Sequence, residues 1–202
     1  MPPPPRLAVL LSGSGSTLQN LLDRTADGRL AAQVVGVVSS RADAYGVERA
    51  RRAGVPVVIA GKPNRSETAF AAVRGWQADL VVLAGWLHLL AVPPDFRGRV
   101  LNVHPALLPK FGGQGMYGRH VHAAVLAAGE TESGCTVHLV DDTYDTGPVV
   151  LQRRVPVLPG DTPDTLAERV QAAEREAYPV AFAKVLASGA PSGAGSSDST
   201  GP

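Results

Sequence analysis

The stretch "RLAVLLSGSGSTLQNLLDRTADG", residues 6–28, decides the expected fold. Its first part, residues 6–12, is apolar throughout and predicts a buried strand, while residues 17–28 have the periodicity of a helix. Between them, Gly13 and Gly15 indicate a tight strand-to-helix turn rich in small hydroxyl residues. Such a turn favours anion binding, because its backbone N–H groups and the helix dipole point at the ligand. The stretch therefore predicts one β–α unit with a phosphate at its turn.

The same alternation continues through the first half of the chain. Further strands are expected at residues 32–40, 55–60 and 78–85, with helices at 44–54 and 65–77 between them. Strands that are apolar throughout are typical of parallel sheets covered on both faces, and strands alternating with helices indicate right-handed βαβ units. We therefore predict an α/β fold with a doubly wound, mostly parallel sheet and helices on both faces.

The second half of the sequence is less regular. It predicts a strand near the start of 98–109, a Gly-rich loop at 111–118, a helix at 120–130, and two strands at 134–142 and 147–157. The two strands alternate apolar and polar residues, which favours a hairpin with its turn near residues 143–146.

The ends of the chain frame a single expected domain. A long helical pattern runs from Pro163 to Ala187 and is expected to be interrupted at Pro179. Residues 1–5 form a Pro-rich extension and residues 188–202 a low-complexity tail that is expected to be disordered. The domain itself is therefore expected to span residues 6–187.

Composition and charge limit the classes of partner that the chain is expected to bind. The net charge is about +1 and the arginines are scattered, so no nucleic-acid partner is expected. The prolines at positions 2–5 exclude the apolar core of a signal peptide at the start, and no apolar run has the length of a membrane span. No membrane association is expected, and the expected location is the cytoplasm. Cys135 is the only cysteine, and His120 and His122 lack a clear third ligand, so no metal site is expected.

The glycine turn does not show which ligand would carry the phosphate. Gly13 and Gly15 permit a close approach, and Ser16 and Thr17 could cap the helix and donate to phosphate oxygens. The Walker pattern is absent because no Gly-Lys-Ser/Thr follows. A dinucleotide turn needs a third glycine where Leu18 stands. A tight turn without any ligand also remains an open interpretation.

The residues after the second expected strand keep a nucleotide alternative open. A dinucleotide site favours an acidic residue there to bind a ribose, whereas this chain has Ser39, Ser40 and Arg41. An arginine can accept the 2′-phosphate of NADP. An NADP-dependent oxidoreductase therefore remains an alternative function.

A second candidate site lies in "LNVHPALLP", residues 101–109. Asn102 and His104 are two residues apart near the carboxyl end of a strand, so their side chains point to the same side. Ligands of open α/β sheets bind at these strand ends. An amide can stabilise an oxyanion and an imidazole can move protons, which indicates acyl-transfer chemistry.

Carboxylates follow in "DDTYDTGPVV", residues 141–150. A carboxylate such as Asp145 beside His104 would favour the imidazolium and raise the pKa of His104. The sequence does not show whether the two residues meet. His138 is expected to be a hydrogen-bonded histidine of the core.

Five segments, taken in chain order, resemble the folate-dependent formyltransferases. They are "SGSGSTLQ" (12–19), "DLVVLAGWLHLL" (79–90), "LNVHPALLPKF" (101–111), "GCTVHLVDDTYDTGPVVLQ" (134–152) and "AEREAYP" (173–179). The run "HPALLPKF" followed by "DTGPV" is typical of the whole family, and the opening segment resembles its glycinamide ribonucleotide branch. The resemblance covers nearly the whole chain apart from its two ends.

The resemblance implies three groups of site residues. The catalytic group comprises Asn102, His104 and Asp145. The group that binds the amine substrate comprises Gly15, Ser16 and Thr17 at the ribose phosphate, together with Glu174. The folate-binding group comprises Arg65, Trp86, Leu87, His88, Leu89, Leu90, Asn102, Val140, Asp141 and Asp145. Two positions depart from the usual pattern, because the family commonly has Asn where Thr17 stands and Arg where His88 stands.

The resemblance also implies a reaction. A formyl group would pass from 10-formyltetrahydrofolate, a co-substrate, to the amine of glycinamide ribonucleotide through a tetrahedral oxyanion, in de novo purine biosynthesis and without a metal. The phosphate at the glycine turn would then belong to the substrate. The number of subunits is not fixed by the sequence, and a homodimer is one open state. Another folate-dependent formyltransferase or hydrolase, or a non-catalytic nucleotide-binding module, also remains an alternative.

Overall fold

Four parallel strands build the first half of the sheet in the computed structural model, which describes residues 3–188. They are β1 (Arg6–Leu11), β2 (Gln33–Ser39), β3 (Val57–Ile59) and β4 (Leu80–Leu83). The helices between them are α1 (Ser16–Ala26), α2 (Tyr45–Arg52) and α3 (Arg65–Gly75). Each of these elements was predicted from the sequence, with its ends displaced by no more than two residues.

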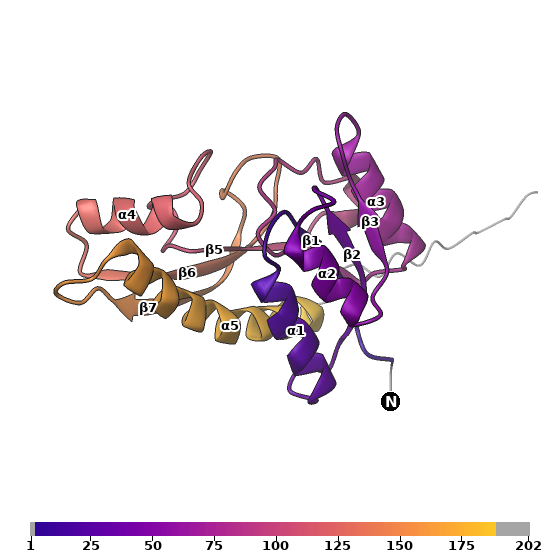
Figure 1. Cartoon of the computed structure of the whole chain (residues 1–202), viewed down its shortest axis with the longest axis horizontal. Helices are drawn as coiled ribbons and strands as arrows, with labels where there is room; N and C mark the ends of the chain where they lie inside the picture. Colours follow the sequence, from indigo (N-terminus) through magenta and orange to yellow (C-terminus); the bar gives the residue numbers. More distant parts are fainter. Residues whose placement is uncertain (1–2, 189–202) are drawn as a thin grey trace, which may run out of the picture.

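The second half of the chain completes the sheet with one parallel and two antiparallel strands. The elements are a short 3₁₀ helix η1 (Pro94–Phe96), β5 (Val100–His104), α4 (Arg119–Ala127), β6 (Glu132–Leu139), β7 (Val149–Pro156) and α5 (Pro163–Ala187). The strand order is β3-β2-β1-β4-β5-β6-β7. β5 is parallel to β4, whereas β6 is antiparallel to β5 and to β7, which confirms the predicted hairpin. The predicted α/β fold with a mostly parallel sheet is therefore confirmed (Figure 1).

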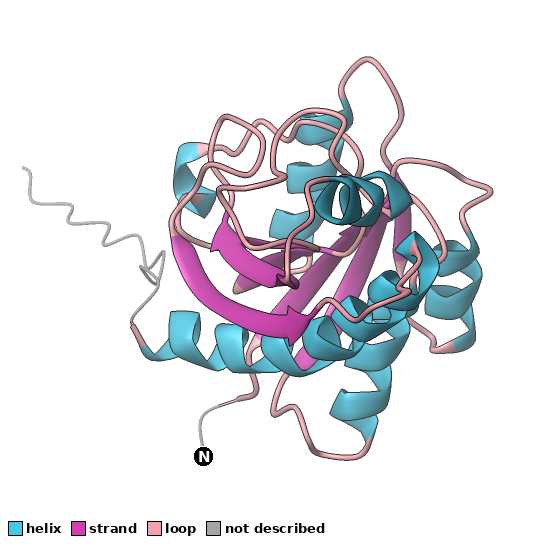
Figure 2. Ribbon diagram, turned by 90° about the vertical axis from the view of Figure 1, so that its left-hand side faces the viewer, coloured by secondary structure: helices cyan, strands magenta, loops and turns pink. Residues whose placement is uncertain are grey.

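The sheet is covered on both faces, and β1 shows why its strands are apolar throughout. Leu7, Val9 and Leu11 pack into a core layer with α1, α2, α4 and α5. Ala8 and Leu10 point the other way, into a second layer with α3. Successive side chains of a strand point to opposite faces, so a central strand covered on both sides must be apolar at every position. Figure 2 shows helices on both sides of the strands.

Gly36 in β2 lies directly under the Trp76 ring that follows α3. A Cβ atom at this position would stand 2.2 Å from Trp76 Cε3. We expect Gly36→Ala to lower the free energy of unfolding by about 1–3 kcal/mol, because the ring must move out of a packed layer. Urea unfolding measures this loss, and Gly61→Ala serves as the control since a Cβ there meets nothing within 4 Å. Equal stability of the two variants would contradict the packing described for Trp76.

The prediction of an interruption at Pro179 is wrong, because α5 continues through this residue. Proline has no N–H to donate to the carbonyl four residues earlier, which belongs to Arg175. That carbonyl instead accepts a hydrogen bond from Asn20 Nδ2 of α1, at 3.5 Å. Tyr178, Pro179 and Phe182 are also buried against the sheet, so tertiary packing stabilises the helix across the proline.

The ends of the chain are only partly described. The predicted tail, residues 188–202, lies outside the described residues apart from Ser188, as do the first two residues of the Pro-rich extension. Across residues 3–188, no helix has the length and apolar character that crossing a membrane requires.

Candidate active site

A cleft of about 610 Å³ opens beside the carboxyl ends of β4 and β5. Loops after β1, β4, β5 and β6 line it, together with the middle of α5. The predicted site residues that line it are Thr17, Trp86, Leu87, His88, Leu89, Leu90, Asn102, His104, Val140, Asp145 and Glu174. Gly15, Ser16, Arg65 and Asp141 do not line it. Most of the residues implied by the resemblance thus share one cleft.

The three predicted catalytic side chains meet at the floor of this cleft. Asn102 and His104 lie two residues apart at the end of β5, as their spacing predicted. Asp145 comes from the loop after β6, and its Oδ2 lies 3.3 Å from His104 Nδ1. Its Oδ1 accepts a long hydrogen bond from Asn102 Nδ2 at 3.4 Å. The structure therefore brings together residues whose proximity the sequence left open.

Asp141 orders the loop that carries Asp145. Its Oδ1 accepts from the Thr143 N–H at 3.1 Å and from the Thr146 hydroxyl at 2.9 Å. Asp145 itself has a φ of 58°, in the left-handed region, and its Oδ2 accepts from the Gly113 N–H at 3.0 Å. Asp141 thus supports the site through the loop.

His138 also belongs to the catalytic cluster, although the sequence indicated only a core histidine. It is buried and lies opposite Asn102 in the antiparallel pairing of β5 with β6. Its Nδ1–H donates to the Leu139 carbonyl at 2.9 Å, so its Nε2 accepts from Asn102 Nδ2 at 3.1 Å. The same Nε2 lies 3.5 Å from Asp145 Oδ1. The strand register that places His138 here has no local sequence signal.

The Asp145 carboxylate raises the pKa of His104, as expected from the sequence, but the net pKa lies below its ordinary value because of burial. His104 is 3% exposed, and burial lowers the pKa of its imidazole more than the Asp145 carboxylate and the Phe111 carbonyl raise it. Its Nε2–H donates to the Phe111 carbonyl at 2.7 Å, which directs Nδ1 to Asp145. Burial also raises the pKa of Asp145, but the nearby His138 and His104 rings and the Gly113 N–H outweigh it, so this pKa lies below its ordinary value.

The glycine turn presents free backbone donors at the start of α1. Gly15 is the N-cap with a φ of 70°, and no side chain caps the helix, so the predicted capping by Ser16 and Thr17 is wrong. A Cβ on Gly15 would stand 2.6 Å from Gly46 Cα, so the turn is packed tightly on α2. Arg49 of α2 donates to the Ser14 carbonyl at 3.0 Å. The uncapped N–H groups at this helix start can therefore bind an anion.

The segment after β4 is tied to the glycine turn, while Arg65 lies to one side. The Leu87 N–H donates to Ser12 Oγ at 3.2 Å, which joins the two loops. The Arg65 Nε–H donates to the Ala60 carbonyl at 3.3 Å. Burial, with the positive charges of Arg65 and Lys62, lowers the pKa of His88. His88 therefore carries less positive charge at the cleft than the arginine that is common at this position in the family.

Glu174 projects from α5 between the glycine turn and the catalytic cluster. It lines both the main cleft and a small neighbouring cavity with Ser16, Thr17 and Asn20. Burial raises the pKa of its carboxyl to about 7.

Within residues 3–188, no group of three or more His, Cys, Asp or Glu residues could hold a metal ion.

Comparison with known proteins assigns the chain to a family. Residues 5–182 match the model of the Formyl transferase family. Phosphoribosylglycinamide formyltransferase of Escherichia coli (strain K12) is 40% identical over 86% of this chain and 84% of its own length. The trifunctional purine biosynthetic protein adenosine-3 of Drosophila pseudoobscura pseudoobscura is 44% identical over 93% of this chain. The matched part makes up 14% of the length of that relative.

A solved structure agrees with these sequence matches. The crystal structure of glycinamide ribonucleotide transformylase 1 from Symbiobacterium toebii is 41% identical and superposes with a TM-score of 0.81, over 94% of this chain and 90% of the other. Both the resemblance drawn from the sequence motifs and the predicted fold are thereby confirmed. The chain belongs to the formyl transferase family.

Proposed function

We propose that this chain transfers the formyl group of 10-formyltetrahydrofolate to the amine of glycinamide ribonucleotide. The observation that carries the proposal is a single cleft in which Thr17 of the glycine turn, Glu174 and the cluster around Asn102 face the same space. A phosphate-bearing amine and a folate can thus be held together, and this proximity accounts for part of the catalysis. The names of the relatives support formyl transfer as the reaction and glycinamide ribonucleotide as the amine substrate.

The chemistry follows from the donors and acceptors of the cluster. The substrate amine attacks the formyl carbon, and the carbonyl oxygen becomes an oxyanion. Asn102 Nδ2 donates to that oxygen, because its 3.4 Å contact with Asp145 is weak enough to be exchanged for a stronger one. The bond from the formyl carbon to the folate nitrogen then breaks, and that nitrogen takes up a proton.

His104 and Asp145 move the proton between the two nitrogens. The bond from His104 Nε2–H to Phe111 leaves Nδ1 without a proton and facing Asp145 Oδ2, 3.3 Å away, so the two groups can take up one proton between them. The pair accepts the proton of the attacking amine, so positive charge develops on the imidazole only when the oxyanion forms. The lowered pKa of His104 then favours delivery of this proton to the folate nitrogen.

The geometry disfavours the NADP alternative. Arg41 was the residue that could have accepted a 2′-phosphate, but both Nε and Nη2 donate to the Asp43 carboxylate, at 3.0 and 2.6 Å. The pair is exposed and opens at small cost, but Asp43 would still repel a phosphate bound at Arg41. We assign the glycine turn to the ribose phosphate of the amine substrate, with Gly15, Ser16 and Thr17 as donors, and the uncapped N–H groups at the start of α1 support this assignment.

Glu174→Gln is expected to raise the KM for glycinamide ribonucleotide by at least about tenfold at pH 8, because a charged acceptor is lost. The same change is expected to stabilise the fold above pH 7. The unfolded carboxyl ionises near pH 4.5 and the folded one near 7, so the wild type loses stability as the pH rises between these values. Solvent in the cleft reduces this effect to about 1–2 kcal/mol.

Urea unfolding at pH 5 and pH 8, together with KM at pH 8, tests both effects of Glu174. Glu168→Gln is the matched control, because Glu168 lies on the same helix but is exposed. A KM unchanged by Glu174→Gln would remove Glu174 from the amine site. A stability gain that is equal at the two pH values would contradict the raised pKa.

The direct test of the proposal measures formyl transfer from 10-formyltetrahydrofolate by folate absorbance, with and without glycinamide ribonucleotide. Turnover that requires the amine is the expected result. Release of folate without the amine would indicate a hydrolase instead. Folded protein that is inactive in both mixtures but enhances NADPH fluorescence would replace the proposal with an oxidoreductase.

A further inference from the structure

Arg49 of α2 packs against the glycine turn but does not line the active-site cleft. Its Nε–H donates to the Ser14 carbonyl at 3.0 Å, and its Cδ lies 3.4 Å from the position that a Cβ atom on Gly15 would take. The Gly46 N–H donates to the Gly13 carbonyl at 3.1 Å and joins α2 to the same turn. The helix α2 lies beside α1 (Figure 1). Arg49 therefore contacts the turn to which we assign the substrate phosphate.

The guanidinium of Arg49 is held in a fixed orientation. Its Nη1 donates to Gln19 Oε1 at 3.0 Å, and the Gln19 amide donates in turn to Asp23 Oδ1 at 2.8 Å. Its Cζ lies 4.8 Å from the centroid of the Tyr45 ring, a distance at which a cation and an aromatic ring attract each other. Because these contacts already order the side chain, the binding of a ligand does not have to order it.

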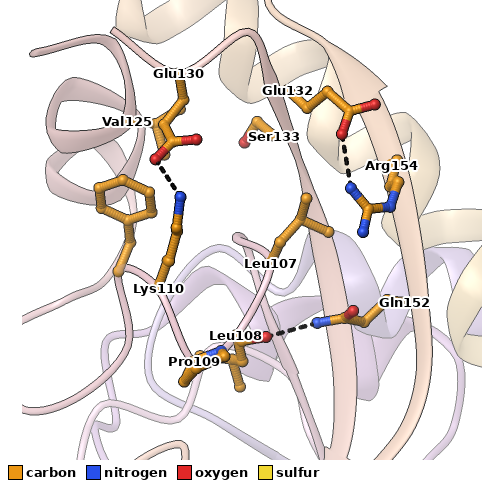
Figure 3. Close-up of a pocket in the computed structure, with 11 residues that line it drawn as sticks. Leu107, Leu108, Pro109, Lys110, Val125, Glu130, Glu132, Ser133, Gln152 and Arg154 are labelled. Carbon is orange, nitrogen blue, oxygen red and sulfur yellow. Dashed lines mark hydrogen bonds and ion pairs between the residues drawn. The ribbon is translucent and has the colours of Figure 1, made fainter. Parts of the chain in front are cut away.

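Arg49 makes no ion pair with any of residues 3–188. Arg52 of the same helix, by contrast, pairs with Glu48 at 2.8 Å. Both cations that line a separate cavity of about 370 Å³ also pair with carboxylates (Figure 3). The positive charge of Arg49 is therefore not neutralised by a neighbouring carboxylate and acts on an anion bound at the turn.

The cleft itself offers no strong cation to a phosphate. Among the described residues, no lysine or arginine lines it, whereas the carboxylates of Asp145 and Glu174 do. A phosphate monoester carries about 1.5–2 negative charges near neutral pH. The start of a helix supplies only about half an elementary positive charge. Binding of this anion therefore favours a further cation close to the turn, which is where Arg49 lies.

The bond from Arg49 to Ser14 acts on the ligand through one peptide unit. The Ser14 carbonyl and the Gly15 N–H belong to the same trans peptide, so they point in opposite directions. The carbonyl accepts from Arg49, while the Gly15 N–H has no acceptor among the described residues. A charged donor on the carbonyl polarises the peptide and strengthens donation by its N–H. Arg49 thus makes the Gly15 N–H a stronger donor to an anion.

We infer that Arg49 is the positioning residue that makes the amine site selective for a phosphorylated substrate. It orients the peptide between Ser14 and Gly15 and adds a positive charge behind it. The phosphate contacts the turn, and Arg49 acts on the phosphate through the turn. The inference rests on the proposed function, because it takes glycinamide ribonucleotide as the amine substrate.

Two amine substrates that differ only in the phosphate test this role: glycinamide ribonucleotide and its dephosphorylated riboside. Arg49→Gln is expected to lower kcat/KM for the ribonucleotide by about ten- to a hundredfold, the range for loss of an interaction with a charged group. The loss should lie in KM, with kcat unchanged, because the phosphate is bound equally before and during the reaction. The kcat/KM for the riboside should not change. A merely structural role of Arg49 would lower both values by the same factor.

Three further variants locate the effect. Arg49→Lys keeps the positive charge, so we expect it to weaken the preference for the ribonucleotide by no more than about fivefold. Arg51→Gln is the matched control, because Arg51 is exposed on the same helix and its loss changes the net charge equally. It should keep the wild-type preference. Arg175→Gln tests the arginine that lines a small cavity with Ser16 and Thr17, and its effect should be smaller than that of Arg49→Gln.

Ribose 5-phosphate probes the turn without formyl transfer. In an NMR titration of the whole chain, the Gly15 amide signal of the wild type should shift to saturation, and Arg49→Gln should raise the Kd about tenfold or more. This result in a chain that transfers no formyl group would contradict the proposed function but support the phosphate role of Arg49.

Three results would overturn the inference, each in proteins whose circular dichroism matches the wild type. The first is an equal loss of kcat/KM for the ribonucleotide and the riboside in Arg49→Gln. The second is equal weakening by Arg49→Lys and Arg49→Gln, which would show that the charge has no part in the preference. The third is a loss of preference confined to Arg175→Gln. Each can occur while the wild type transfers formyl groups, so the inference can fail while the proposed function stands.

Discussion

Asp145→Asn is expected to lower kcat for formyl transfer by about a thousandfold, the middle of the range for loss of a general acid–base group. The amide keeps the shape of the carboxylate and can still accept from the Gly113 N–H, 3.0 Å away in the wild type. Asparagine also tolerates the left-handed backbone that Asp145 adopts, with a φ of 58°. What the variant loses is the carboxylate that, together with His104 Nδ1, takes up the proton of the attacking amine.

Asp142→Asn is the control for Asp145→Asn. Asp142 lies in the same loop, but its side chain is exposed and faces Arg97 at 3.6 Å. We expect the control to retain the kcat of the wild type, and thermal unfolding should confirm that both variants are folded. An Asp145→Asn protein with more than about a tenth of the wild-type kcat would exclude Asp145 from proton transfer.

The sequence predicted the elements of the sheet well because their signals are local. The apolar runs of β1, β2 and β4 are continuous, since both faces of these strands are covered, and a window of a few residues shows this. Pro179 shows where local reasoning fails. The partner that replaces its missing N–H is Asn20, which lies far away in the sequence.

The catalytic cluster could be predicted only in part for the same reason. Asn102 and His104 share a strand, so their common direction follows from spacing alone. His138 joins them only through the register of β6 against β5, and a shift of one residue would turn it to the other face. The raising effect of Asp145 on the pKa of His104 was predicted, but the larger lowering by burial was not, because burial depends on segments such as the loop at Phe111 that fold over His104.

Asn102→Ala is expected to lower kcat by about a hundredfold or more with little change in the KM for either substrate. Its Nδ2 is the amide donor assigned to the oxyanion, and an oxyanion donor acts chiefly in the transition state. The fold should lose only about 1 kcal/mol, because His138 Nε2 loses the donor that lies 3.1 Å away. Steady-state kinetics and urea unfolding separate the two effects.

Two further variants decide whether the amide N–H of Asn102 is the group that stabilises the oxyanion. Asn102→Asp keeps the size of the side chain but replaces the donor by a second carboxylate beside Asp145, so we expect it to be at least as inactive as Asn102→Ala. Asn64→Ala is the control, since Asn64 is exposed and makes no side-chain cap to α3. If Asn102→Asp retained wild-type kcat, donation by Asn102 could not stabilise the oxyanion, and the catalytic role would have to pass to another group of the cleft.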